Sequence, residues 1–126
     1  MAFISDMPAA LSAASLAIGR GGAGTVSELW ATRTPGVVLP YPWHKDRHQA
    51  HNAATLVASG GAVVVDDAID AERTIEAAAG TLERVLRDRE RLSGMRRAMG
   101  SLPVADGARR AAERIACAPE AEGSVR

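Results

Sequence analysis

Three short apolar segments that alternate with helix-like segments are the feature that most limits how this sequence folds. The apolar segments cover residues 16–18, 37–39 and 62–65, and helical patterns cover residues 7–15, 25–33, 46–59, 69 to about 99, and 108–117. This alternation is typical of an α/β fold with a parallel sheet. Because parallel sheets are covered on both faces and rarely stop at three strands, the sequence predicts part of a larger sheet that lacks its first strands.

Capping and helix-breaking residues set the expected boundaries. Ser5 or Asp6 is expected to cap the first helix, and Gly80 and Gly94 are expected to divide the long helical segment. Residues 1–118 are predicted to form one domain, followed by a polar tail over residues 119–126.

The composition narrows the class of protein. Lys plus Arg and Asp plus Glu number 15 each, so the charge balance gives no argument for nucleic-acid binding. Cys117 is the sole cysteine, which fits a reducing compartment, and we expect it to be a small buried apolar residue. No apolar run has the length of a membrane span, and residues 1–6 lack the pattern of a secretory signal. A soluble cytoplasmic domain is expected.

Residues 19–29, with the sequence GRGGAGTVSEL, allow two interpretations. Glycines let backbone N–H groups approach an anion, and the helix that follows offers free N–H groups and the positive end of its dipole. A diphosphate fits there without a metal ion. Thr25 and Glu28 also form the T-x-x-E pattern of a capping box, in which Glu28 would only cap its own helix. The loop by itself leaves both interpretations open.

Residues 19–24 also match the G-x-G-x-x-G pattern of dinucleotide-binding folds, which would indicate a nicotinamide-dependent oxidoreductase. The context argues against this interpretation. The helix that follows is short and ends at Pro35 and Gly36, and the next strand ends at Pro40, where a dinucleotide fold has an acidic residue for the ribose.

Residues 46–49, DRHQ, look like a second helix start after a strand, with Asp46 as the cap and Gln49 at the third helical position. Glu28 and Gln49 would then occupy equivalent places and face one crevice at the carboxyl ends of the strands. A carboxylate and a carboxamide suit the hydroxyls of a ribose and a sugar. Two ordinary capping boxes would give the same pattern.

The histidines and aromatic residues of the same region give weaker signals. His44, His48 and His51 lie close in sequence but lack the further ligands of a familiar metal site, so no metal ion is predicted. His48 is expected to act as a hydrogen-bonding group in the crevice. Tyr41 and Trp43 lie in a proline-containing loop and are expected to line the pocket.

Three ordered motifs are much more specific than the glycine pattern. They are F-I-x-D-M from Phe3, R-x-G-A-x-T-x-S-E from Arg20, and D-R-H-Q-x-x-N-A from Asp46. In these motifs the chain resembles the C-terminal, donor-binding half of the MurG glycosyltransferases of family 28, strongly over residues 3–52 and more weakly afterwards. The resemblance implies a partial Rossmann-like sheet of about three strands with flanking helices, the C-terminal part of a GT-B glycosyltransferase.

The resemblance also implies roles for individual residues in binding UDP-GlcNAc. Ile4 would meet the uracil through its backbone, with Phe3 and Met7 nearby. Glu28 would bind the ribose hydroxyls, and His48 and Gln49 would reach the GlcNAc. The diphosphate would lie along Arg20, Gly21, Gly22, Ala23, Gly24 and Thr25. Two of these positions depart from the family pattern, because Gly21 stands where Ser is frequent and Gly24 where a larger apolar residue is frequent.

The function implied by the resemblance is part of an inverting transfer of GlcNAc to undecaprenyl-pyrophosphoryl-MurNAc-pentapeptide, in peptidoglycan synthesis at the cytoplasmic face of the inner membrane. No cofactor or metal is expected. The general base and the contacts to the lipid-linked acceptor are expected in an N-terminal domain or a partner chain, so this chain is not expected to be active alone. An exposed sheet edge is expected to favour association. The alternatives are the donor-binding subunit of another split UDP-sugar glycosyltransferase and a non-enzymatic nucleotide-binding module.

Overall fold

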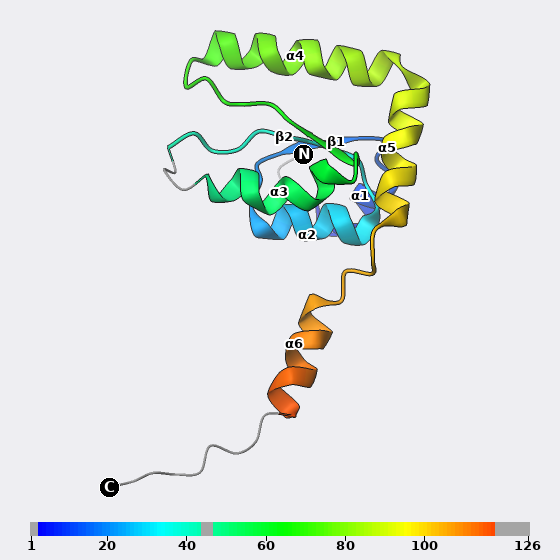
Figure 1. Cartoon of the computed structure of the whole chain (residues 1–126). Coiled ribbons are helices and arrows are strands. Elements are labelled where there is room, and N and C mark those ends of the chain that lie inside the picture. The colour runs from blue at the N-terminus through cyan, green and yellow to red at the C-terminus, as the bar shows by residue number, and fades with distance from the viewer. Residues whose placement is uncertain (1–2, 44–46, 118–126) are drawn as a thin grey trace, which may run out of the picture.

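Three parallel strands form the centre of the molecule. The computed structural model describes residues 3–43 and 47–117. Strands β1 (Ala17–Gly19), β2 (Gly36–Val38) and β3 (Ala62–Val64) form one sheet in the order β1-β2-β3 (Figure 1). The register places Ile18 beside Val37 and Val37 beside Val63. Each strand lies within one residue of its predicted position, and the predicted α/β class with a parallel sheet is confirmed.

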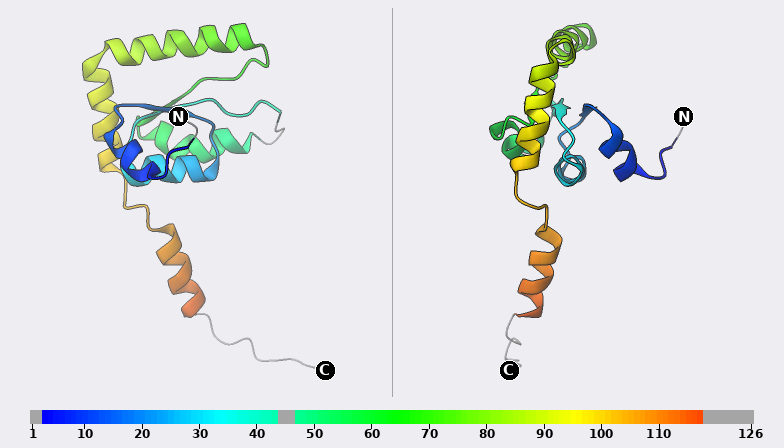
Figure 2. Two further views of the ribbon diagram at one scale, coloured as in Figure 1. Left: turned by 180° about the vertical axis from the view of Figure 1, so that it is seen from behind. Right: turned by 90° about the vertical axis from the view of Figure 1, so that its right-hand side faces the viewer.

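Helices α2 (Ala23–Thr32) and α3 (His48–Ala58) connect successive strands and cover one face of the sheet (Figures 1 and 2). Leu29 of α2 and Leu56 of α3 are buried in the core together with Val38 of β2. Side chains alternate along a strand. The side chains of the residues that directly precede and follow Ile18, Val37 and Val63 in the sequence therefore point towards α2 and α3. Helix α1 (Met7–Ala13) precedes β1, and the Asp6 carboxylate caps it by accepting from Ala9 N at 3.0 Å, as predicted.

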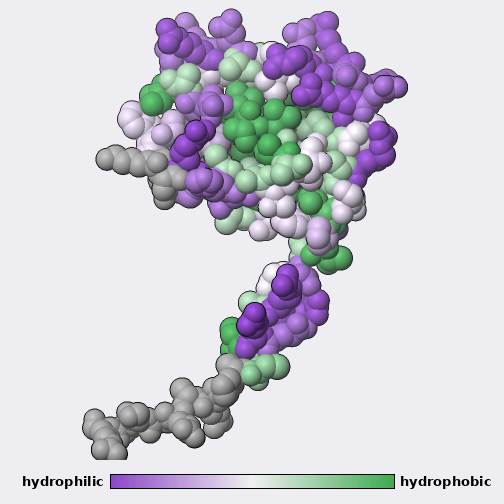
Figure 3. Space-filling view, viewed as in Figure 1, coloured by the Kyte–Doolittle hydropathy of each residue, from purple (hydrophilic) through white to green (hydrophobic). Residues whose placement is uncertain are grey.

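The opposite face of the sheet is only partly covered. Helix α4 (Ala71–Arg87) lies on that side (Figures 1 and 2), and hydrophobic side chains gather on the visible surface between α4 and α3 (Figure 3). Ile18 is 57% exposed although its neighbour Val37 is 1% exposed. The prediction that residues 16–18 form a buried strand is therefore wrong in its burial, because β1 is an edge strand of the described sheet.

The long helical segment is interrupted at Asp88, where α4 ends and α5 (Arg89–Ser101) begins. The Asp88 backbone is extended, and its carboxylate accepts from Arg91 N at 2.8 Å. The predicted breaks at Gly80 and Gly94 are wrong, since both glycines lie inside helices. A glycine in a helix costs only about 1 kcal/mol, so a capping carboxylate at the right place decides where the helix ends.

Helix α6 (Gly107–Ala116) extends away from the rest of the described chain (Figures 1 and 2). Its residues are exposed, and so is Cys117. The prediction that Cys117 is buried is wrong because α6 packs against no core that could cover it. Within the described residues, every helix is too short or too polar to cross a membrane.

Candidate functional site

The loop after β1 and the start of α3 are packed against each other at the carboxyl edge of the sheet. A Cβ atom on Gly21 would lie 2.8 Å from the Gln49 carbonyl carbon and 3.1 Å from the Gln49 Cβ, and closer still to the Gln49 carbonyl oxygen. Asn52 Nδ2 donates to the Gly21 carbonyl at 3.0 Å. Tyr41 N, in the loop after β2, donates to Gln49 Oε1 at 2.8 Å. Loops after two neighbouring strands are thus joined through Gln49.

The start of α2 is not capped by a side chain. Its N-cap is Gly22, so Thr25 is the third helical residue and Glu28 the sixth. Of the two interpretations of residues 19–29, the capping box is wrong, since its threonine must stand at the N-cap and Thr25 lies inside the helix. By contrast, α1, α4 and α5 begin at capping carboxylates, those of Asp6, Asp70 and Asp88.

The N–H groups of Ala23, Gly24 and Thr25 have no acceptor among residues 3–43 and 47–117. These are the first three residues of α2, where the intrahelical hydrogen-bond pattern supplies no partner. The start of α2 therefore presents free donors and the positive end of the helix dipole beside the Gly21–Gly22 loop.

The start of α3 differs from the predicted one. Its N-cap is Arg47, which has a left-handed backbone (φ 49°) and gives no side-chain capping bond. Asp46, the predicted cap, lies outside the described residues, as does His44. Gln49 is the second helical residue, so it is not equivalent to Glu28, the sixth residue of α2. The predicted equivalence of these two side chains is wrong.

The Arg20 guanidinium links the carboxyl ends of all three strands. Nη1 donates to the Leu39 and Pro40 carbonyls at 3.2 and 3.3 Å, and to Asp67 Oδ2 at 2.8 Å. The guanidinium also lies 5.7 Å from the centroid of the Tyr41 ring, within range of a cation–π contact. The Asp67 carboxylate accepts hydrogen bonds from Arg20 and from Ile69 N. These bonds hold the pKa of the carboxyl below its ordinary value, against a smaller opposing effect of desolvation.

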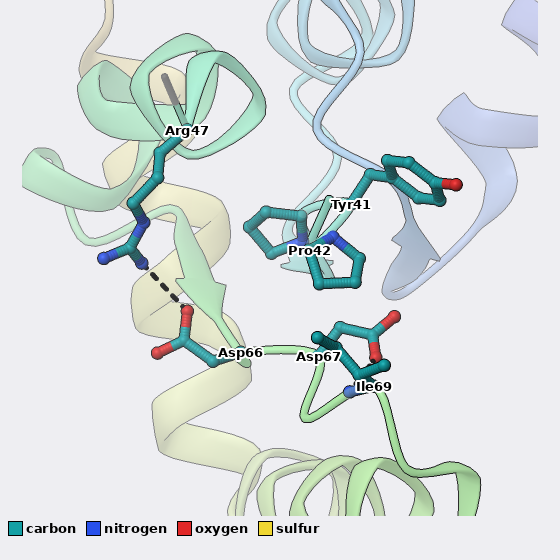
Figure 4. A pocket seen from close by; sticks show the side chains of 7 residues that line it. Tyr41, Pro42, Arg47, Asp66, Asp67 and Ile69 are labelled. Carbon is teal, nitrogen blue, oxygen red and sulfur yellow. Dashed lines mark hydrogen bonds and ion pairs between the residues drawn. The ribbon is translucent and has the colours of Figure 1, made fainter. Parts of the chain in front are cut away.

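A pocket of about 280 Å³ lies between the loops after β2 and β3 (Figure 4). Tyr41 and Pro42 form one side, and Arg47 and Asp66, paired at 3.0 Å, form another. Tyr41, which was expected to line the ligand pocket, lines this cavity. Trp43 is 65% exposed and is not among the residues that line this pocket.

Sequence reasoning did not assign a role to Asp66 and Asp67. The available signal was their position, because both directly follow a predicted strand, where ligand sites of parallel sheets gather. Their partners Arg47 and Arg20 are distant in sequence, so the ion pairs themselves could not be predicted.

The remaining predicted site residues are not among those that line the pocket between the loops after β2 and β3. Glu28 lines a second cavity of about 670 Å³, together with Trp30 and the segment between α5 and α6. Trp30 Nε1 donates to the Pro103 carbonyl at 2.7 Å in that segment. Phe3 and Ile4 precede α1 and are 81% and 42% exposed, and Met7 begins α1 at 37%. His48 is the first residue of α3 and is half-buried.

The described residues contain no group of three or more His, Cys, Asp or Glu side chains arranged to hold a metal ion. The unpaired N–H groups at the start of α2 and the Arg20 guanidinium are hydrogen-bond donors of the kind that suit an anion.

Comparisons with known proteins place the chain in a family. Residues 1–115 match the model of the glycosyltransferase family 28 C-terminal domain. The chain is 39% identical over 114 residues to a protein of Gloeobacter violaceus, covering 90% of this chain and 31% of that protein. It is 40% identical over 114 residues to a protein of Chlorobium luteolum, covering 90% and 30%. Both relatives are named UDP-N-acetylglucosamine–N-acetylmuramyl-(pentapeptide) pyrophosphoryl-undecaprenol N-acetylglucosamine transferase.

A solved structure gives the same result. The crystal structure of Acinetobacter baumannii MurG matches with a TM-score of 0.74 and 26% sequence identity, over 92% of this chain and 32% of that one. The chain thus spans about a third of the length of the relatives it matches. Its three-stranded parallel sheet with flanking helices is the C-terminal part of a GT-B glycosyltransferase fold, and the chain belongs to the glycosyltransferase family 28 C-terminal domain family.

Proposed function

We propose that this chain is the UDP-GlcNAc-binding part of a MurG-like inverting glycosyltransferase, which transfers GlcNAc to undecaprenyl-pyrophosphoryl-MurNAc-pentapeptide to make lipid II. Family membership and the names of the relatives support the choice of donor and reaction. The observation that carries the proposal is the uncapped start of α2 beside the Gly21–Gly22 loop, where the N–H groups of Ala23, Gly24 and Thr25 are free for a diphosphate.

The family resemblance suggests roles for the other residues, and their positions are compatible with these roles. Arg20 adds a positive charge next to the loop, with its side chain 50% exposed. Glu28, which caps no helix, is free to accept hydrogen bonds from the ribose hydroxyls. Tyr41 N fixes the Gln49 carboxamide through its oxygen, so that Nε2 is the end offered to the sugar, beside His48. Phe3, Ile4 and Met7 form an exposed apolar segment that suits the uracil.

The acceptor side of the reaction lies in sequence beyond this chain, either in the same polypeptide or in a partner chain. The lipid-linked acceptor places the complete enzyme at the cytoplasmic face of the inner membrane, and the reaction places it in peptidoglycan synthesis, with effects on cell shape and division. The general base that removes the proton of the acceptor hydroxyl belongs to that acceptor side.

Ligand-observed NMR tests the class of ligand. The chain is mixed separately with UDP-GlcNAc, UDP and NADH, and saturation transfer to each ligand is recorded. We expect transfer to UDP-GlcNAc and UDP, and none to NADH. Transfer to NADH without transfer to UDP would refute the proposal and favour the dinucleotide interpretation of residues 19–24.

The Glu28→Ala variant tests the ribose contact. Loss of charge-assisted hydrogen bonds worth about 1.5–3 kcal/mol should weaken UDP binding roughly 10- to 100-fold. Because Glu28 is exposed and caps nothing, the free energy of unfolding should change by less than about 0.5 kcal/mol. Glu76→Ala, on the exposed surface of α4, is the charge-matched control and should leave both quantities unchanged. A Glu28 variant with normal UDP affinity would remove this residue from the site.

A further inference from the structure

In the described residues, the Arg20 side chain makes its hydrogen bonds through a single nitrogen. Within the part of the chain that the structure describes, Nη1 makes the hydrogen bonds to the Leu39 and Pro40 carbonyls and to Asp67. Nε and Nη2 make none, and half of the side chain is exposed. An arginine held in this way offers its other edge, with two parallel N–H donors, for bidentate contact with a phosphate.

Asp67 is the charged member of the group that holds Arg20. Its side chain is only 13% exposed, and Oδ2 lies 2.8 Å from Arg20 Nη1. Oδ1 accepts from Ile69 N at 3.0 Å and from Thr74 Oγ1 at 3.1 Å, so the carboxylate is itself fixed by the loop before α4 and by its first turn. Thr74 Oγ1 in turn accepts from Ala68 N at 3.0 Å. A fixed carboxylate is able to fix the guanidinium that it binds.

We infer that Asp67 is a positioning residue for nucleotide binding, which orients Arg20 so that its Nε and Nη2 edge faces the diphosphate of the UDP-sugar. This inference rests on the proposed function. Asp67 touches no ligand in this scheme and acts only through Arg20. Free arginine side chains lose conformational freedom when they bind, and a side chain that is already ordered loses less.

The negative charge of Asp67 has an opposite effect on binding, because it would repel a diphosphate. Asp67→Asn separates the two effects, because the amide keeps an oxygen that accepts from Arg20 but loses the charge. If positioning dominates, Asp67→Ala weakens UDP binding about three- to tenfold, the cost of ordering one long side chain, and Asp67→Asn weakens it less. If repulsion dominates, both variants bind UDP more tightly than the original chain.

The experiment measures dissociation constants of the whole chain for UDP and for uridine by NMR titration. Uridine lacks the diphosphate, so its affinity should not change in either Asp67 variant, whereas a general disturbance of the fold would lower both affinities. In an Arg20→Ala background, Asp67→Ala should have no further effect on UDP. Glu76→Ala, which removes a carboxylate from the exposed surface of α4, is the matched control and should leave UDP and uridine binding unchanged.

A second measurement does not depend on a ligand. The Arg20 Nε–Hε signal of the labelled chain should report an ordered side chain, and in Asp67→Ala it should show the averaging of a mobile one. Three results would each overturn the inference while leaving the proposed function standing. They are unchanged or tighter UDP binding in Asp67→Ala, an equal loss of affinity for uridine, and an Arg20 signal that does not change. Failure of the original chain to bind either UDP or UDP-GlcNAc would overturn the proposed function, and the inference with it.

Discussion

Replacing Gly21 with alanine should disturb the site because of a close approach between backbones. A Cβ atom at this position would lie 2.8 Å from the carbonyl carbon of Gln49, whereas unstrained contacts of this kind are longer than about 3.4 Å. The atoms nearest to this Cβ belong to the backbone of α3, so the movement of a flexible side chain cannot relieve the clash. The hydrogen bond from Asn52 Nδ2 to the Gly21 carbonyl resists separation of the loop and the helix.

The Gly21→Ala substitution should lower the free energy of unfolding by about 2–3 kcal/mol, which is the upper part of the range for overpacking. For a domain of this size, 1 kcal/mol shifts the melting temperature by about 3–6 °C, so the Gly21→Ala melting temperature should fall by roughly 6–18 °C. The neighbouring glycine supplies the control. Gly24 lies inside α2 with no atom within 4 Å of its added Cβ, so Gly24→Ala should raise the stability by up to about 1 kcal/mol.

Thermal and urea denaturation followed by circular dichroism measure both variants under the same conditions. The comparison removes the general effect of replacing a glycine by an alanine in this loop region. Equal melting temperatures for Gly21→Ala and Gly24→Ala would refute the close packing of the glycine loop against α3. The result also bears on the family pattern, because a serine at position 21 would meet the same obstacle in this chain.

Two further predictions concern stability. Gly80→Ala should stabilise the chain by about 0.5–1 kcal/mol, since α4 continues through Gly80 and an added Cβ meets only Arg84 Nη1 at 3.6 Å; a loss of stability in urea denaturation would instead support a helix break there. The pKa of Asp67 is lowered from 3.8 in the folded chain, so its contribution to stability is complete above that pH and is lost as the pH falls through the folded value. Asp67→Asn lacks this contribution, and its stability deficit, measured by denaturation between pH 7 and pH 2, should shrink in acid; a constant deficit would contradict the Arg20–Asp67 ion pair.

Local patterns in the sequence identified most of the elements and the edge of the sheet where the candidate site is proposed. Short β-branched segments next to glycines and prolines, such as 36–38, depend mostly on neighbouring residues, so they were placed to within one residue. The Asp6 cap was predicted for the same reason. The helix starts of α2 and α3 were placed less well. Side-chain capping is optional, and Gly22 and Arg47 begin these helices without it.

The motif residues were assigned to a nucleotide site from the sequence because their types and spacing match a family pattern, and the family itself is confirmed. Individual roles, including those of Glu28 and His48, stay predictions. The sequence could not decide whether Glu28 caps its own helix, because that depends on whether the N-cap of α2 is Thr25 or lies three residues earlier. The structure decided it by placing Gly22 at the N-cap.

The sequence by itself determined an α/β chain with three short strands, a glycine loop before a helix, and membership in a glycosyltransferase family. Only the tertiary structure decided that Gly21 lies against Gln49, that Arg20 joins three strand ends, and that Asp67 holds it. These contacts connect residues 28 and 47 positions apart, and their geometry depends on how parallel strands and their loops meet at one edge. A sequence pattern reports the nearest neighbours along the chain, whereas the site is built from neighbours across the sheet.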